Sequence, residues 1–174
     1  MCRTIVNVVL AAAMALFGAL TSARAGDAPV VVELFTSQGC SSCPPADAYL
    51  GQLADRDDII ALSLHVDYWD YLGWRDVFGS KGHTKRQRRY AKALGERMIY
   101  TPQIIINGRE GMVGSRRGQV AEAIERHRAR PAAAEIALSL SGDRLVADIT
   151  PLAENAGGGN VFLCWFKRAE TVST

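Results

Sequence analysis

The sequence has little net charge, few aromatic residues and no internal repeats. Its formal charge is +2, from 20 basic and 18 acidic residues. Such a balance lacks the large excess of Lys and Arg that is typical of proteins that bind nucleic acid, so we expect no nucleic-acid partner. Hydrophobic residues make up 48% of the chain, which is enough for a packed core and excludes a wholly disordered chain.

The N-terminal apolar run predicts a signal peptide. Arg3 precedes the run IVNVVLAAAMALFGAL, and the small residues Ala23 and Ala25 flank a cleavage site. The run is shorter than the about 20 residues of a membrane-spanning helix, although an N-terminal anchor is the alternative. We therefore interpret residues 1–25 as a cleaved signal, and expect a secreted or periplasmic protein with no stable membrane insertion afterwards. Without Arg3 and Arg24, eighteen basic residues face eighteen acidic ones.

Cysteine is scarce: the sequence has four, of which Cys2 would leave with the signal peptide. The remaining number is odd, so one thiol is left after any pair forms in an oxidising compartment. Cys40 and Cys43 form a Cys-x-x-Cys pair with two serines between them. Cys164 lies in the apolar stretch VFLCWF, where we expect a small buried side chain, or an exposed thiol if that region is cut short.

The Cys-x-x-Cys pair lies between a predicted strand and a predicted helix. An apolar, β-branched run at residues 29–36 precedes it, and a helical pattern with Pro44 in its first turn follows. The dipole and the unpaired N–H groups of a helix N-terminus stabilise a thiolate. We therefore predict a redox site in which Cys40 attacks a substrate and Cys43 resolves the mixed disulfide.

Strands and helices alternate over most of the chain. We expect strands at residues 29–36, 58–69, 103–107 and 108–114, and helices at 40–55, 84–95 and 116–130. Thr84 and Gln87 predict a capping box for the second helix, and Ser115 a cap for the third. This pattern predicts a parallel sheet with crossover helices and a closing antiparallel hairpin. The order βαβαββα predicts an α/β fold and resembles a thioredoxin-like core, which we assign to residues 28–130.

Residues 131–174 show strand patterns without helices. Two alternating strands over residues 134–150 turn at Gly142, and we expect a third strand at residues 160–168. Such a small sheet leaves exposed edges. We therefore interpret this segment as a partial, truncated β-rich domain that follows the α/β core.

Thr101 and Pro102 stand directly before the third strand of the core. Thioredoxin-like folds place a cis-proline there, facing the Cys-x-x-Cys pair, where it exposes the neighbouring backbone to an extended substrate. An ordinary turn proline is the alternative. His65 and Trp69 belong to the end of the second strand, where open α/β sheets build sites. We expect Thr101, Trp69 and His65 to bind substrate, with simple loop packing as the alternative.

Glu33 places a carboxylate in the first apolar strand. A buried carboxylate is costly unless it has a task or a partner. Thioredoxins carry a buried Asp on the corresponding strand that helps to deprotonate the resolving cysteine. Glu33 is therefore a candidate proton shuttle for Cys43, and the alternative is an inward carboxylate held by backbone groups or by an arginine.

Four stretches together are similar to one family. They are ELFTSQGCSSCPPAD, HVDYWDYLGWRDVF, TKRQRRYA and YTPQIIINGREGMVGS. They resemble the secreted thioredoxin-like family catalogued as domain of unknown function 1223, from about Val30 to the C-terminus. The resemblance implies export and a thioredoxin-like core followed by a β-rich region, and it implies no particular substrate.

The sequence as a whole predicts an exported thiol–disulfide oxidoreductase. Its partner would be a protein or small-thiol substrate, held through a transient mixed disulfide, and we expect no cofactor and no resident metal. One alternative is a copper metallochaperone that uses Cys40, Cys43 and His65. Another is a non-catalytic binding module in which Cys40 and Cys43 form a structural disulfide.

Overall fold

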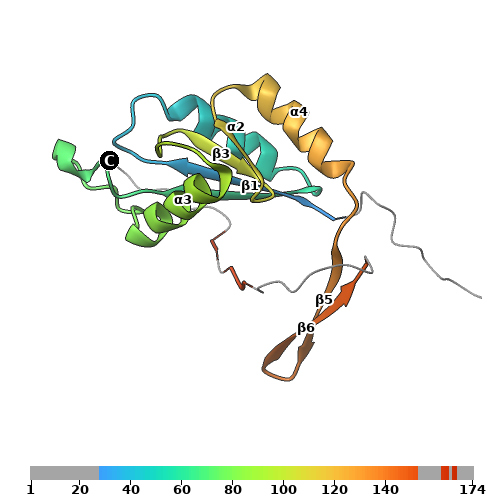
Figure 1. Ribbon diagram of the computed structural model, residues 1–174. Coiled ribbons are helices and arrows are strands. Elements are labelled where there is room, and N and C mark those ends of the chain that lie inside the picture. The colour runs from blue at the N-terminus through green and yellow to red at the C-terminus, as the bar shows by residue number, and fades with distance from the viewer. Residues whose placement is uncertain (1–27, 153–161, 165, 168–174) are drawn as a thin grey trace, which may run out of the picture.

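A computed structural model describes residues 28–152, 162–164 and 166–167, so the predicted signal peptide lies outside the described residues. These residues form a mixed α/β structure with two sheets and three α-helices (Figure 1). The elements are β1 (Val30–Thr36), α2 (Pro44–Ala54), β2 (Ile59–His65), the 3₁₀ helix η1 (Asp70–Leu72), α3 (Lys81–Leu94), β3 (Gln103–Ile106), β4 (Glu110–Val113), α4 (Arg117–Arg128), β5 (Ala134–Ser141) and β6 (Arg144–Pro151). The predicted order of strands and helices is confirmed up to β6.

β1 is an inner strand of the larger sheet, as its apolar and β-branched residues predict. The strand order is β2-β1-β3-β4. β1 pairs in parallel with β2 and antiparallel with β3, and β3 forms a hairpin with β4. The hairpin turn needs a left-handed backbone at Asn107 (φ 47°) and Gly108 (φ 66°), which Asn and Gly adopt most readily.

The direction of β3 differs from the parallel arrangement that the sequence predicts. α3 begins where β2 ends, because the Ser80 N–H donates to the His65 carbonyl at 3.1 Å. The helix ends beside β4, where Leu94 lies against Gly111. The segment after α3 returns to the end of the sheet from which the helix started, so Gln103 pairs with Phe35 and β3 runs antiparallel to β1.

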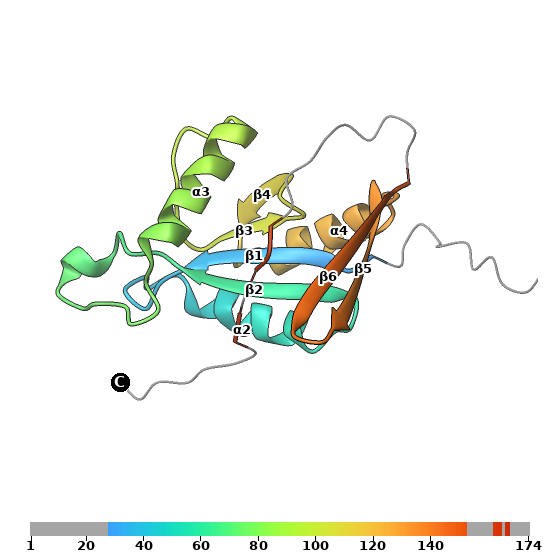
Figure 2. The same cartoon turned by 90° about the horizontal axis from the view of Figure 1, so that it is seen from below.

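The two faces of the larger sheet are covered by different helices (Figures 1 and 2). Val32 and Leu34 point to one face and pack with Ala46 of α2 and Ile124 of α4. The intervening residues of β1 point to the opposite face, which α3 covers. Phe35 packs there with side chains that include Ile105, Tyr90 and Leu94. Successive side chains of β1 therefore alternate between the face covered by α2 and α4 and the face covered by α3.

The predicted N-terminal caps of α3 and α4 are wrong. α3 begins one turn earlier than its expected capping box, at Lys81, and the Ser80 hydroxyl caps it by accepting from the Gly82 N–H at 3.1 Å. Thr84 and Gln87 instead lie buried within the helix. α4 has Arg116 as its N-cap, without a side-chain cap from Ser115.

β5 and β6 form an antiparallel hairpin with its turn at Gly142 (φ 65°), as predicted. Ile136 pairs with Ile149 and Leu140 with Leu145, so apolar side chains share one face of the hairpin. These four side chains are exposed. The predicted third strand is not seen in residues 162–164 and 166–167, which have no regular secondary structure, and Cys164 is an exposed free thiol rather than a buried side chain.

Candidate functional site

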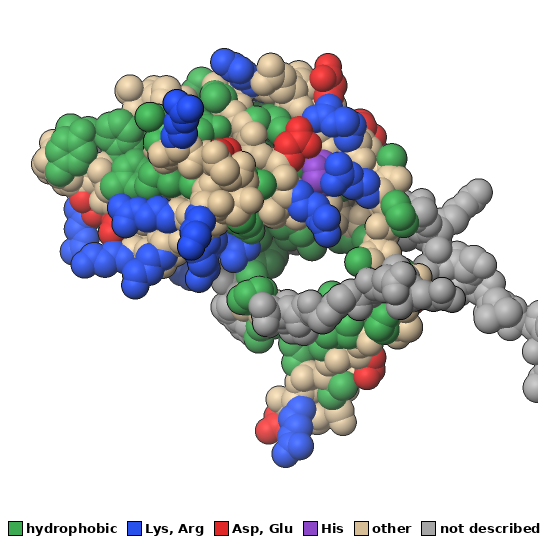
Figure 3. Space-filling model, in the orientation of Figure 1, with side chains coloured by type: hydrophobic (Ala, Val, Ile, Leu, Met, Phe, Trp, Pro, Cys, Tyr) green, Lys and Arg blue, Asp and Glu red, His purple; other side chains and the backbone are tan. Residues whose placement is uncertain are grey.

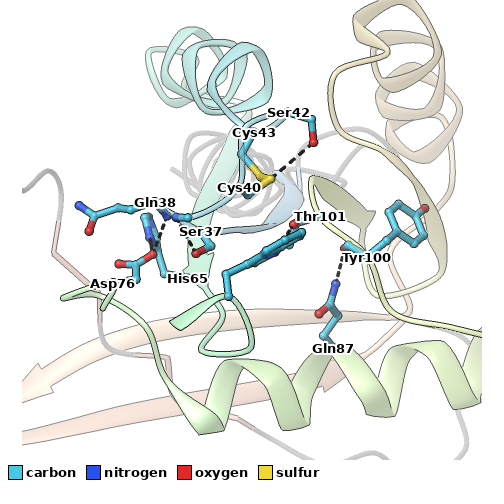
Figure 4. Close-up of a disulfide and its surroundings, with 12 residues drawn as sticks. Ser37, Gln38, Cys40, Ser42, Cys43, His65, Asp76, Gln87, Tyr100 and Thr101 are labelled. Atoms are coloured by element: carbon cyan, nitrogen blue, oxygen red, sulfur yellow. Dashed lines mark hydrogen bonds and ion pairs between the residues drawn. A yellow bond between two sulfur atoms is a disulfide. The ribbon is translucent and has the colours of Figure 1, made fainter. Parts of the chain in front are cut away.

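Cys40 and Cys43 form a disulfide at the start of α2, with their Cα atoms 5.4 Å apart (Figure 4). The helix begins at Pro44, so Cys43 rather than Cys40 is the N-cap residue. The Cys43 N–H donates to the Cys40 carbonyl at 3.1 Å, which turns the chain into the helix. Proline suits the first helical turn because its missing N–H has no intrahelical partner there, which explains the later start.

The two sulfurs differ in access. Cys43 is fully buried, whereas Cys40 keeps 4% of its surface exposed. The Cys40 Sγ lies 3.5 Å from the Oγ of the exposed Ser42. Cys40 is therefore the sulfur of the pair that lies nearer to solvent.

A buried carboxylate holds the loop that leads to Cys40. Asp76 is 2% exposed, and its Oδ2 accepts from the Gln38 N–H at 2.8 Å. The same oxygen lies 2.7 Å from the Nδ1 of His65, and Oδ1 accepts from the Phe78 N–H at 2.9 Å. Burial acts to raise the pKa of Asp76, but the hydrogen bonds from Gln38, His65 and Phe78 outweigh it and hold the pKa below its usual value.

His65 lies at the end of the second strand of the sequence, as predicted, and its ring is held by Asp76. It is the last residue of β2 and pairs in register with Thr36 of β1. Its ring lies against Asp76 on one side of the disulfide, as Figure 4 shows. Asp76 itself was missed by sequence reasoning, since nothing in the loop around WRDVF distinguishes it from a solvated acid.

Trp69 connects the loop of the cysteines to the loop of Pro102. Its Nε1 donates to the Thr101 hydroxyl at 2.8 Å. Its Cβ would lie 3.1 Å from a Cβ placed on Gly39, so a larger residue there would push the two segments a few tenths of an ångström apart. The Thr101–Pro102 peptide bond is cis, as the sequence predicts. Trp69, Thr101 and Cys40 therefore belong to neighbouring loops at the same end of the sheet.

A buried amide network fixes the Pro102 loop from the side of α3. The Gln87 Nε2 donates to the Tyr100 carbonyl at 2.7 Å and to the Gln103 Oε1 at 2.9 Å. The Gln103 Nε2 donates in turn to Glu96 at 2.6 Å. Gln87, which the sequence predicts as a helix cap, is instead one of the residues that hold this loop in place.

Apolar side chains project from the loop around η1, beside the disulfide. Tyr71 is 75% exposed and Trp74 is 49% exposed, and Leu72 and Val77 are also exposed. We call these four residues the apolar rim; hydrophobic side chains gather on this lobe of the molecule (Figure 3). The Trp74 Nε1 donates to the Gln38 side chain at 3.3 Å, so the rim is joined to the loop that leads to Cys40.

Glu33 lies on the other face of the sheet. Its carboxylate accepts from the Arg86 Nε at 2.8 Å and from the Tyr90 hydroxyl, both on α3. Burial and the contact with Glu33 raise the pKa of Tyr90, which keeps its hydroxyl a donor. The structure thus pairs Glu33 with an arginine and does not bring it beside Cys43.

Two further observations concern metals and membranes. Within the described residues, no three His, Cys, Asp or Glu side chains are grouped as metal ligands. No helix in that part of the chain is long and apolar enough to span a bilayer.

Comparison with known proteins identifies the family. No protein with a curated description matches the chain. A similar crystal structure is that of a structural-genomics target from Agrobacterium tumefaciens, which is 42% identical with a TM-score of 0.64. The match covers 70% of this chain and 56% of that one, so the chain spans little more than half of that protein's length. A family model described as "Protein of unknown function (DUF1223)" matches residues 31–174, and the chain therefore belongs to the DUF1223 family.

Proposed function

We propose that the chain is a thioredoxin-like thiol–disulfide oxidoreductase that uses Cys40 and Cys43 and acts after export. The observation that carries the proposal is the disulfide at the start of α2, next to the loop of the cis-proline Pro102 and joined to it by Trp69. A reactive disulfide needs one reachable sulfur and a resolving sulfur protected from solvent. Both cysteines are buried, but Cys40 keeps 4% of its surface exposed and Cys43 keeps none, an order that fits these two roles.

The exchange begins when a substrate thiolate attacks the Cys40 Sγ. A bond forms between the two sulfurs, the Cys40–Cys43 bond breaks, and its electron pair leaves on the Cys43 sulfur, which then takes up a proton. A second substrate thiolate then attacks the substrate sulfur of this mixed disulfide. The bond from that sulfur to Cys40 breaks, and Cys40 leaves as a thiolate. Two substrate thiols are oxidised to one disulfide, and the protein disulfide is reduced to two thiols. The same steps in reverse reduce a substrate disulfide.

The apolar rim favours a protein substrate over a small thiol. Tyr71 and Trp74 present large apolar surfaces with a polar end, which is the composition of protein-binding surfaces. A peptide that reaches the narrow opening at Cys40 would lie between this rim and Thr101. A small thiol would use little of the rim.

The first test of this function is the reduction potential of the Cys40–Cys43 disulfide, measured in glutathione or dithiothreitol buffers. A potential above about −300 mV supports exchange with substrates, and a lower one indicates a structural disulfide. The matched control is Cys164→Ser, which removes the exposed thiol and should leave the potential unchanged.

The second test is capture of the mixed disulfide. Cys43→Ser in the Cys164→Ser background should trap partner proteins on Cys40, and the additional change Cys40→Ser should abolish trapping. Equal trapping by both variants would contradict the proposal.

A further inference from the structure

A cavity lies at the far end of β1 from the disulfide. Its volume is about 470 Å³, and Val31, near the start of β1, lines it together with residues 131–133, which lead to β5. Five basic side chains line it: Arg86, Arg109, His127, Arg128 and Arg130. Among the described residues that line this cavity, none is an Asp or a Glu. We call it the arginine cavity.

The positive charge of the arginine cavity is only partly compensated by neighbouring acids. Arg86 is paired with Glu33 at 2.6 Å, Arg128 is paired with Glu125 at 2.9 Å and also with Asp58, and His127 lies beside Glu110. Arg109 and Arg130 are exposed and have no ion-pair partner in the part of the chain that the structure describes. Lys and Arg side chains, together with Asp and Glu side chains, lie around a histidine on the side of the core that carries the end of α4 (Figure 3).

Buried polar atoms without partners give the second reason to expect a ligand here. His127 is 3% exposed, and its Nε2 lies 3.1 Å from Glu110. Its Nδ1 and the Arg128 Nε are buried and make no hydrogen bond with any described residue. A buried polar group without a partner is unfavourable, and such groups are rare unless they have a role.

We propose that the arginine cavity binds a small organic anion that carries more than one phosphate or carboxylate group. Guanidinium groups match both kinds of oxyanion through paired N–H donors, and four arginines line this space. The volume is large enough for a small anion with two or more charged groups. This site is separate from the disulfide, because the two lie beyond opposite ends of β1, and its occupation does not depend on thiol chemistry.

The test uses the full chain in low-salt buffer, with pyrophosphate and citrate as probes and sodium chloride at matched ionic strength as the reference. Binding is measured by isothermal titration calorimetry for the wild type, for R109S/R130S and for the control R88S/R89S. Arg88 and Arg89 are exposed on α3 and do not line the cavity. We expect the loss of two charged donors to weaken binding at least about tenfold in R109S/R130S and to leave the control unchanged. The absence of binding in the wild type, or an equal loss in both double variants, would overturn the proposal.

A second measurement locates the bound anion directly. Pyrophosphate or citrate should shift the imidazole NMR signals of His127 and leave those of His65, beside the disulfide, unchanged. His127→Gln identifies the His127 signal. If a bound probe leaves that signal in place, the anion lies elsewhere and the assignment of the cavity is wrong.

Discussion

Asp76 holds together the loop that leads to Cys40, and replacing it with Asn should loosen that loop. The carboxylate accepts from two backbone N–H groups, of Gln38 and Phe78, and binds the ring of His65. An Asn side chain keeps one acceptor oxygen and presents an NH₂ group in place of the other. At least one backbone N–H is then left facing a donor inside the protein. We expect Asp76→Asn to lower the free energy of unfolding by about 2–4 kcal/mol.

Urea denaturation of the oxidised chain at pH 7 measures this loss. Asp70→Asn is the matched control, because Asp70 lies in the same loop and accepts a single N–H, that of Asp76, at 3.2 Å. Its amide retains an acceptor oxygen, so the control should lose less than about 1 kcal/mol. Equal stabilities of Asp76→Asn and the wild type would refute the role of this carboxylate.

The pH dependence of the unfolding free energy gives an independent check that the ionised Asp76 stabilises the fold. The pKa of Asp76 is lower in the folded state than in the unfolded chain. The carboxylate therefore stabilises the fold above the unfolded pKa of about 3.9, and this stabilisation is lost as the pH falls through the folded pKa. The difference between the wild type and Asp76→Asn should be largest near neutral pH and should shrink below about pH 4.

Four further substitutions test other parts of the argument. Glu33→Gln should leave the pH dependence of disulfide exchange unchanged, because Glu33 lies on the α3 face; a shifted profile in a stopped-flow exchange assay would restore the shuttle hypothesis. Gly39→Ala should destabilise the chain by about 1–3 kcal/mol in urea because the new Cβ meets Trp69, whereas Gly51→Ala, with open space in α2, should stabilise it by about 0.5–1 kcal/mol. Leu138→Lys on β5 should reduce self-association in sedimentation experiments without changing the exchange rate, since Leu138 is 64% exposed.

The local patterns of the sequence predict the elements well. The apolar run of β1, the turn signal at Gly142 and the helical spacing of Ala46, Leu50 and Leu53 depend on neighbouring residues only, and each is confirmed. Gly95 ends α3 in the left-handed conformation, as its type predicts. These features depend on residues close together in the sequence, so they can be predicted without knowledge of the tertiary structure.

The direction of β3 and the partners of the buried acids could not be predicted in this way. Whether β3 runs parallel or antiparallel to β1 depends on the path of α3 across the sheet. The hydrophobic periodicity of the sequence does not indicate this path. Asp76 and Glu33 find partners 38 and 53 residues away along the chain. The choice between a proton shuttle and an ion pair for Glu33 was therefore open until the face of β1 on which it lies was known.

The hairpin of β5 and β6 has a geometric consequence for assembly. Within the described residues, each of its two strands pairs only with the other, so both outer edges keep unpaired backbone groups. A copy that docks on one edge leaves the opposite edge available for the next. Pairing of the same edge in two copies would give a closed two-fold dimer, whereas pairing of unlike edges would give a contact that can repeat from copy to copy.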